Sequence, residues 1–369
     1  MTNMVLSQTI PTANGRRIGR LTLNHPEHLN ALNTTMIGQI HQQLESWRHD
    51  SRVVAVVLDS NCDRAFCAGG DLFSMHHIMT ANPNQLQPDL AEFLASEYRL
   101  DHAIFHFPKP LLVWADGIIM GGGVGLLVGA SHRVVTERAR LAMPEVMVGL
   151  FPDVGSTWFL NRMEPEVARF WALTGSQING VDAVALSLAD EQIKNDQKQA
   201  IMSQLQLLSW QADGSDHQSL SELLHEYRIH QPSQGWLTSR IELIEQLCAG
   251  DSVAQVQQQL NDYQGSDGWI KKAALNFASG SPISAHIIWR QLAIRGMSLA
   301  DCFRLELSIV ANLGRHGELT EGIRALLIDK DRTPNWRYAS LSDVPDSVID
   351  DLLTSPWPQS QHPLVDLRD

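Results

Sequence analysis

The sequence is poor in cysteine and has no long hydrophobic run. Its 369 residues include only four cysteines, Cys62, Cys67, Cys248 and Cys302. These are too sparse for a disulfide framework, and their spacing is not that of a zinc site. No apolar stretch approaches the roughly 18 residues that a membrane helix needs. The sequence therefore argues against a disulfide-rich domain, a zinc module and a membrane-spanning protein.

Positive charge is also scarce. Lys and Arg number 28 against 41 Asp and Glu, which gives a formal net charge of −13. This balance opposes broad attraction to nucleic acid or to an anionic membrane, so neither is predicted as a partner. An anionic ligand would need a local basic pocket. Residues 1–12 resemble neither a secretion signal nor a transit peptide, so a cytoplasmic location is expected.

The histidines and cysteines suggest no metal site. None of the 15 histidines stands at a recognisable ligand spacing from a cysteine or a carboxylate, and His76-His77 is expected on a helix surface. Cys67 lies in a glycine turn, where a nucleophilic role is conceivable. No His-Asn pattern accompanies it, so a small buried hydrophobic side chain is favoured.

Two glycine turns are the most informative stretches. Phe66–Asp71 follows the apolar run Val53–Leu58, and Met120–Gly125 follows Pro110–Ala115, both typical of buried strands. Glycine lets a backbone approach a ligand closely, and a helix start favours negative charge. Two amides aimed at one point would form an oxyanion hole. The alternative is that each turn only connects a strand to a helix.

The pattern of elements predicts an α/β fold followed by helices. Strand, turn and helix recur three times in the first half, which favours stacked β-β-α units. We predict a core over residues 1–190, a helical extension over 191–355, and a loosely held tail over 356–369. Expected strands are Ile18–Leu23, Val53–Leu58, Pro110–Ala115, Val134–Thr136 and Arg140–Met143, and expected helices include Asn33–Trp47, Pro88–His106 and Pro282–Arg295.

Two carboxylates follow the glycine turns, Glu145 after Pro144 and Asp153 after Pro152. Their apolar surroundings would raise the pKa of each carboxyl group, which suits acid–base chemistry, and proline fixes the local backbone. The alternative is that both side chains cap helices. The nearby glycine turns favour the chemical interpretation.

Together these motifs resemble the crotonase superfamily, which has the enoyl-CoA hydratase and isomerase fold. The resemblance runs from about Ile18 to Leu341, and the forms Cys67–Asp71 and Phe151–Asp153 are similar to the 3-hydroxyisobutyryl-CoA hydrolase branch, as is Arg324–Asp331. Asn30–Leu32 resembles the acyl-CoA-binding segment. The resemblance implies a spiral of repeated β-β-α units with a helical C-terminal extension.

The resemblance also implies roles for individual residues. The amides of Gly70 and Gly122 match the oxyanion hole, and Glu145 matches a catalytic glutamate of the family. Our hypothesis is that Glu145 either attacks the carbonyl to form an anhydride or activates the attacking water, and that Asp153 orients this water or supplies a proton. Glu97 matches a glutamate that contacts the substrate; its alternative is a solvated charge on a helix. A hydratase carries a second glutamate where this chain has Gly125, so ordinary hydration is disfavoured.

The implied reaction is hydrolysis of a short β-hydroxyacyl-CoA thioester, most simply 3-hydroxyisobutyryl-CoA in valine degradation. Coenzyme A would be part of the substrate, and no separate cofactor is expected. Hydratase or isomerase activity, or an inactive acyl-CoA-binding scaffold, are the alternatives. The family commonly has Arg or Lys where this chain has His25, so Lys330 or Arg332 would have to meet the CoA phosphates. A homo-oligomer is possible.

Overall fold

A computed structural model describes residues 3–369 of the chain. It consists of two compact units, and each is built from three separate stretches. The first unit comprises the chain up to Gly70, Arg99–Leu141 and Ile178–Ser239, and the second comprises Asp71–Tyr98, Ala142–Gln177 and Arg240–Asp369. Within residues 3–369, no helix combines the length and the apolar character that crossing a membrane requires.

The first unit contains a six-stranded sheet in the order β1-β2-β3-β5-β7-β10. Strands β1 and β2 pair antiparallel, and the remaining neighbours in the sheet are parallel. Parallel strands that are covered on both faces read as continuous apolar runs, which explains the run in β3. The bounds are β1 Val5–Pro11, β2 Arg17–Leu23, β3 Val53–Ser60, β5 Leu111–Ala115, β7 His132–Val135 and β10 Glu191–Gln192.

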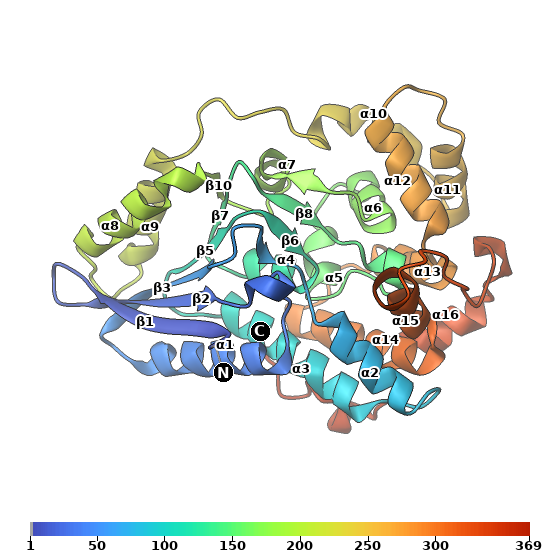
Figure 1. The fold of residues 1–369 in the computed structure, drawn as a ribbon, viewed down its shortest axis with the longest axis horizontal. Coiled ribbons are helices and arrows are strands. Elements are labelled where there is room, and N and C mark those ends of the chain that lie inside the picture. The colour runs from blue at the N-terminus through green and yellow to red at the C-terminus, as the bar shows by residue number, and fades with distance from the viewer. Residues whose placement is uncertain (1–2) are drawn as a thin grey trace. The chain divides into compact units, whose positions relative to one another are not determined.

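Helices cover both faces of this sheet. Helix α1 (Thr34–His49) begins where the side chain of Asn33 accepts a hydrogen bond from the Met36 amide. Gly19 of β2 faces α1, since a side chain there would meet the ring of Trp47. The adjacent Ile18 packs with buried residues of α8 (Lys198–Leu207) and α9 (Ser215–Glu226), on the opposite face. Figure 1 shows α1 running along β1.

A smaller four-stranded sheet carries the glycine turns. Its order is β4-β6-β8-β9, with bounds Ala65–Cys67, Ile118–Met120, Arg140–Ala142 and Ile178–Asn179. Strands β4 and β6 are parallel neighbours, so their carboxyl ends lie at the same edge. The short helices α4 (Gly122–Val128) and α7 (Gly180–Ala185) follow β6 and β9.

The second unit is helical. Helix α3 contributes its first part, up to Tyr98. Helix α14 is buried along much of its length, because it presents apolar residues on more than one side. The bounds are α2 Leu72–Ala81, α3 Pro88–Phe105, α5 Ser156–Leu160, α6 Pro165–Thr174, α10 Ile241–Cys248, α11 Val253–Asn261, α12 Gly268–Ser279, α13 Pro282–Gln291, α14 Leu299–His316, α15 Glu318–Ile323 and α16 Asp346–Leu353, with a 3₁₀ turn η2 at Glu145–Val148.

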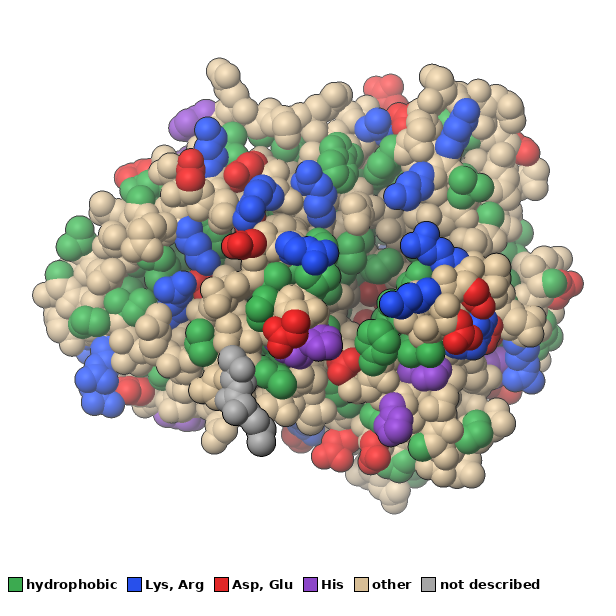
Figure 2. Space-filling view, in the orientation of Figure 1, with side chains coloured by type: hydrophobic (Ala, Val, Ile, Leu, Met, Phe, Trp, Pro, Cys, Tyr) green, Lys and Arg blue, Asp and Glu red, His purple; other side chains and the backbone are tan. Residues whose placement is uncertain are grey.

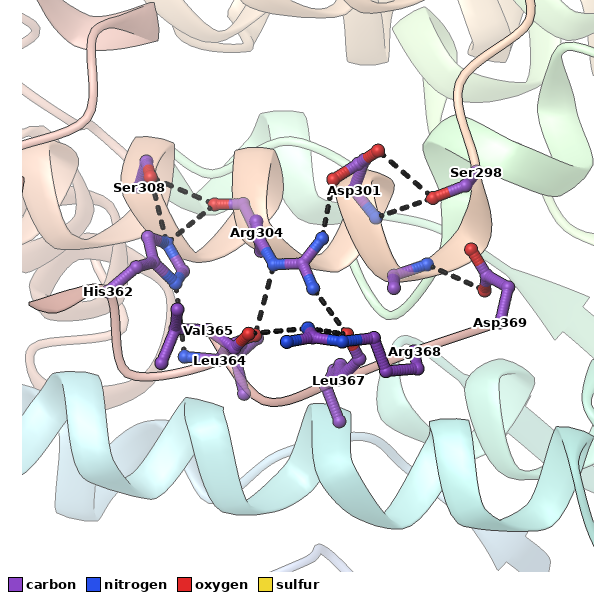
Figure 3. A network of polar contacts seen from close by, with 11 residues as sticks. Ser298, Asp301, Arg304, Ser308, His362, Leu364, Val365, Leu367, Arg368 and Asp369 are labelled. Atoms are coloured by element: carbon purple, nitrogen blue, oxygen red, sulfur yellow. Dashed lines mark hydrogen bonds and ion pairs between the residues drawn. The ribbon is translucent and has the colours of Figure 1, made fainter. Parts of the chain in front are cut away.

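The predicted α/β class and the helical character of the later chain are confirmed, and the division at residues 190 and 355 stays a prediction. The prediction of a loosely held tail is wrong for residues 362–367. Arg304 of α14 donates from Nε to the Leu364 carbonyl at 3.0 Å and from a second nitrogen to the Leu367 carbonyl. His362 accepts from the Leu364 amide at 3.0 Å, as Figure 3 shows. The composition is polar, but the two leucines are buried.

Candidate active site

The two predicted glycine turns lie side by side in the first unit. A side chain on Gly69 would lie 3.2 Å from the Met120 carbonyl oxygen and 3.7 Å from the Gly122 amide nitrogen. Gly69 has a φ of +102°, a conformation that glycine adopts without strain. Gly70 and Gly122 therefore stand on neighbouring turns. The idea that each turn merely connects two elements does not account for this close approach.

Gly122 is the first residue of α4, where an amide has no partner within its own helix. The helix sits tightly on β4, since a side chain on Gly123 would lie 2.5 Å from the Cys67 carbonyl oxygen. Cys67 is fully buried, as predicted for a small hydrophobic side chain. These contacts fix the direction of the Gly122 amide relative to the first turn.

The predicted carboxylates gather in the second unit. Glu97 of α3 is 2% exposed, and Glu145 at the start of η2 and Asp153 before α5 are each 6% exposed. Glu97 is therefore no solvated helix charge. The capping alternative is also wrong, because the N-cap residues of η2 and α5 are Pro144 and Gly155, and neither Glu145 nor Asp153 caps these helices with its side chain.

Two oxygens of this cluster lack partners. Among the described residues, Glu97 Oε1 and Glu145 Oε2 are buried without any hydrogen bond. A buried polar atom without a partner costs free energy, and such atoms are uncommon in folded proteins. An unpaired carboxyl oxygen in a cluster of acids is therefore available to a substrate.

Asp153 differs from its neighbours because it has a partner. The hydroxyl of Tyr98 donates to Asp153 Oδ2 at 2.6 Å. Burial raises the pKa of Asp153 to about 6, although the Tyr98 hydrogen bond lowers it. Burial, and then the charge of Asp153, raises the pKa of Glu97 to about 8. The same two causes raise the pKa of Glu145 well above its ordinary value.

These shifts separate the roles of the acids near neutral pH. Burial raises the pKa of all three groups, and the charge of Asp153 raises those of Glu97 and Glu145 further, so Asp153 loses its proton before they do. Interacting acids with separated pKa values provide one base and one acid in the same cluster. Perturbed carboxyl groups of this kind concentrate at functional sites.

Sequence reasoning missed two residues of this cluster. Tyr98 reads as part of the apolar face of α3, and its contact with Asp153 spans 55 positions. Glu306 of α14 is fully buried and accepts from the amides of Gly155 and Thr157. The signal for Glu306 is its spacing, because it stands three residues after Phe303 and one before Leu307 on an apolar helix face.

The residues considered for the CoA phosphates are partly accessible. In the first unit, His25 lies 3.5 Å from Glu27, and its ring is tilted against the ring of His28, with ring centres 4.4 Å apart. In the second unit, Lys330 and Arg332 are exposed. Figure 2 shows several Lys and Arg side chains on one face among mostly uncharged ones, so the net negative charge does not exclude local basic positions. A phosphate role for any of the three stays a prediction.

Neighbouring glycine turns that can present two amides are typical of enzymes that act at a carbonyl group, and so are buried carboxyl groups with unpaired oxygens. Comparison with known proteins agrees with this class. The family model of enoyl-CoA hydratase/isomerase matches residues 18–353. The chain belongs to this family, as its resemblance to the crotonase superfamily predicts.

Relatives and solved structures narrow the comparison. The chain is 34% identical over 337 residues to the mitochondrial 3-hydroxyisobutyryl-CoA hydrolase of Gallus gallus, covering 90% of this chain and 85% of the relative. The corresponding protein of Homo sapiens is 33% identical over 330 residues, covering 88% and 83%. A carnitinyl-CoA dehydratase structure from Mycobacterium thermoresistibile matches with a TM-score of 0.84, 29% identity and 99% coverage of both chains. An enoyl-CoA hydratase structure from Rhodobacter sphaeroides matches with a TM-score of 0.81 and 30% identity, covering 95% of this chain and 97% of that one.

Proposed function

We propose that this protein hydrolyses 3-hydroxyisobutyryl-CoA to 3-hydroxyisobutyrate and free coenzyme A. The observation that carries the proposal is the buried pair Glu145 and Asp153: burial raises the pKa of both carboxyl groups, and the charge of Asp153 raises the pKa of Glu145 further. Gly125 stands where a hydratase has its second glutamate. The names of the similar proteins, 3-hydroxyisobutyryl-CoA hydrolase, support the same reaction. Its place in valine degradation stays a prediction.

The amides of Gly70 and Gly122 would hold the thioester oxygen. Attack on the carbonyl carbon builds negative charge on this oxygen, and a fixed amide donor stabilises that charge more than it stabilises the neutral substrate. Loss of one such donor typically costs about 2.7–4 kcal/mol of transition-state stabilisation.

The carboxyl pair would supply the attacking group and the proton. In one route, Glu145 gives its proton to Asp153 and its carboxylate attacks the carbonyl carbon. The C–S bond breaks, the CoA thiolate takes the proton from Asp153, and water hydrolyses the resulting anhydride. In the other route, the pair removes a proton from water, whose oxygen attacks directly, and the pair then protonates the thiolate. Both routes begin with Asp153 ionised.

Glu97 would bind the substrate through its free oxygen. The β-hydroxyl of the acyl group is both a donor and an acceptor, and Glu97 Oε1 is buried without a partner. A hydrogen bond there would distinguish a hydroxyacyl group from the plain acyl group of equal length. This is the type of discrimination that polar pockets achieve best.

The test is release of free CoA from a panel of acyl thioesters by the purified protein. We expect rapid release from 3-hydroxyisobutyryl-CoA, slower release from isobutyryl-CoA, and loss of about 10³-fold or more in kcat for Glu145→Gln. Strong hydration of crotonyl-CoA without free CoA would favour the hydratase alternative. Wild-type rates in Glu145→Gln would place the reaction at another group, and no turnover of any thioester by the wild-type protein would favour the inactive scaffold.

A single turnover in oxygen-18 water separates the two routes. The anhydride route can place label in the Glu145 carboxyl group, when water attacks the Glu145 side of the anhydride, whereas direct attack of water on the thioester leaves the protein unlabelled. The cytoplasmic location, the lack of a separate cofactor or metal, and the homo-oligomer stay predictions.

A further inference from the structure

Helix α5 begins without a local cap, and a distant carboxylate replaces it. Its N-cap residue, Gly155, has a φ of +85° and no side chain that could accept from the helix amides. Glu306 of α14 accepts from the Gly155 amide at 2.7 Å and from the Thr157 amide at 2.8 Å, one with each carboxyl oxygen. Asp153 lies two residues before this doubly held turn.

The cap is costly for a helix of five residues. Glu306 is fully buried, and burial raises the pKa of its carboxyl group to about 8 although both amides lower it. A local Ser, Thr or Asp normally satisfies such amides from an exposed position. Stability of α5 alone therefore does not explain why a carboxylate 151 residues away is buried for this purpose.

The same turn is fixed from two further directions. Gln291 Nε2 donates to the Pro152 carbonyl at 2.7 Å and to Thr157 Oγ1 at 2.9 Å. Phe303, one turn before Glu306, stacks on Tyr98 with ring centres 5.5 Å apart. Tyr98 in turn donates to Asp153. One face of α14 therefore supports both the backbone that carries Asp153 and the tyrosine that orients its carboxylate.

We propose that Glu306 and Tyr98 are positioning residues that hold Asp153 in its reactive orientation, Glu306 through the backbone and Tyr98 through the side chain. This inference rests on the proposed thioester hydrolysis. Misplacement of a catalytic group by about 1 Å can cost about 10²-fold in rate. Contacts that hold the backbone and the carboxyl group of Asp153 in place therefore affect the rate. Neither residue is assigned contact with the substrate.

The test is a double-mutant cycle on the full-length protein with 3-hydroxyisobutyryl-CoA. Glu306→Gln keeps one accepting oxygen and loses the other, and Tyr98→Phe removes only the hydroxyl. We expect each to lower kcat by about 10-fold to 10²-fold with KM within about twofold. In the Asp153→Asn background, each should change kcat less than about twofold, because the group they position is already gone.

Glu318→Gln is the matched control. Glu318 is also a buried carboxyl group of the second unit, but it accepts from Ser281 Oγ at 2.7 Å and is not bonded to the Asp153 turn. The substitution Glu318→Gln should leave kcat unchanged. If Glu306→Gln lowers kcat equally with and without Asp153, or raises KM alone, the positioning role is wrong. If Glu306→Gln does not fold, the test uses Tyr98→Phe, whose effect on kcat is compared in the presence and in the absence of Asp153 in the same way.

A second readout does not depend on activity. Amide hydrogen exchange at Gly155 and Thr157 should accelerate in Glu306→Gln and not in Glu318→Gln, because only the first removes an acceptor from these amides. Unchanged exchange would overturn the inference even if hydrolysis is established. If exchange accelerates in Glu306→Gln but the wild-type protein releases no CoA, the contact of Glu306 with these amides is confirmed and the proposed function is refuted instead.

Discussion

At the scale of single residues, the site is defined by carboxyl groups that the fold keeps from water. Glu97, Glu145 and Asp153 are all buried, yet only Asp153 receives a hydrogen bond from another side chain. A protein that needed these positions only for packing would be more stable with apolar side chains there. The unpaired oxygens therefore reflect a requirement of function, and such sites commonly reduce stability.

Glu97→Gln tests this cost. The pKa of Glu97 is raised on folding, so the native state holds a proton that the unfolded chain has lost, and stability falls as the pH rises from about 4.5 towards 8. Glutamine cannot ionise, so the variant should become increasingly more stable than wild type as the pH rises through this window, on the order of a few kcal/mol at pH 8, and should gain nothing below it. Urea unfolding at pH 4.5 and pH 8 measures the difference.

The exposed Glu92 of the same helix provides the control. Glu92→Gln should alter the free energy of unfolding by less than about 0.5 kcal/mol at either pH. Equal stability of Glu97→Gln and wild type at pH 8 would mean that the buried carboxyl group carries no cost.

The pH dependence of catalysis follows from Asp153. Both routes require its carboxylate, and its pKa lies at about 6. We expect kcat/KM to fall by about tenfold for each pH unit well below 6. In Asp153→Asn, the residual activity should lack this acidic limb. A limb with the same midpoint in that variant would assign the titration to another group.

Residue identities were predictable where a local motif carried them. Glu145, Asp153 and the two glycine turns stand in short segments with recognisable spacing, and the structure places the turns together and buries the acids. Tyr98 and Glu306 were not predictable in the same way, because their partners lie 55 and 151 positions away. Only the fold brings such partners together.

At the scale of elements, the position of the second glycine turn, Met120–Gly125, depends on how closely α4 approaches β4. The contact leaves no room for a side chain at Gly123, where a Cβ would lie 2.5 Å from the Cys67 carbonyl oxygen and 2.9 Å from Cys67 Cβ. Both of these neighbours belong to a buried strand and cannot move easily. The helix, and with it the Gly122 amide, would have to shift.

Gly123→Ala should therefore lower both stability and activity. We expect a loss of about 1–3 kcal/mol in the free energy of unfolding from overpacking, and a fall of about 10²-fold in kcat as the Gly122 amide moves. Denaturant unfolding and CoA release measure the two effects. Full activity in this variant would show that the Gly122 amide does not need its present position.

Gly38→Ala is the matched substitution. Gly38 lies on the exposed side of α1, and a side chain there would meet nothing within 4 Å. Alanine at this position should stabilise the protein by about 0.5–1 kcal/mol, because glycine weakens a helix interior, and should leave kcat unchanged.

Element prediction succeeded where periodicity or capping was strong. The helix expected over Asn33–Trp47 is confirmed as α1. The apolar runs of β3 and β5 were also correct, because burial on both faces imposes continuous apolar sequence. Strand β1 was not predicted, since it is largely exposed and polar and its pairing with β2 is what stabilises it. The chain segment of α14 was also not identified, although its apolar residues recur with helical spacing.

At the scale of the whole chain, the sequence predicted the class and the family but not the interleaving of the two units. The order of strands and helices along the chain indicates α/β units, and the family model confirms the resemblance. Each unit is assembled from three separate stretches, and no composition change marks their bounds. Long-range packing decides this arrangement, and a local pattern does not report it.

The C-terminal segment illustrates the same limit and provides the last prediction. Leu364 and Leu367 are buried, and Arg304 of α14 holds the carbonyls of both, as Figure 3 shows. Deleting residues 364–369 should cost about 3 kcal/mol of unfolding free energy, because two buried leucines and their hydrogen bonds are lost.

Arg304→Lys should cost less, since lysine keeps one hydrogen-bond donor but not the planar guanidinium group that reaches both carbonyls. Arg290→Lys is the control, because Arg290 forms an exposed ion pair with Asp350 on the surface. This substitution should change the free energy of unfolding by less than about 0.5 kcal/mol. Thermal and urea unfolding of the three variants rank these effects, and a deletion as stable as the full chain would mean that the segment only rests on α14.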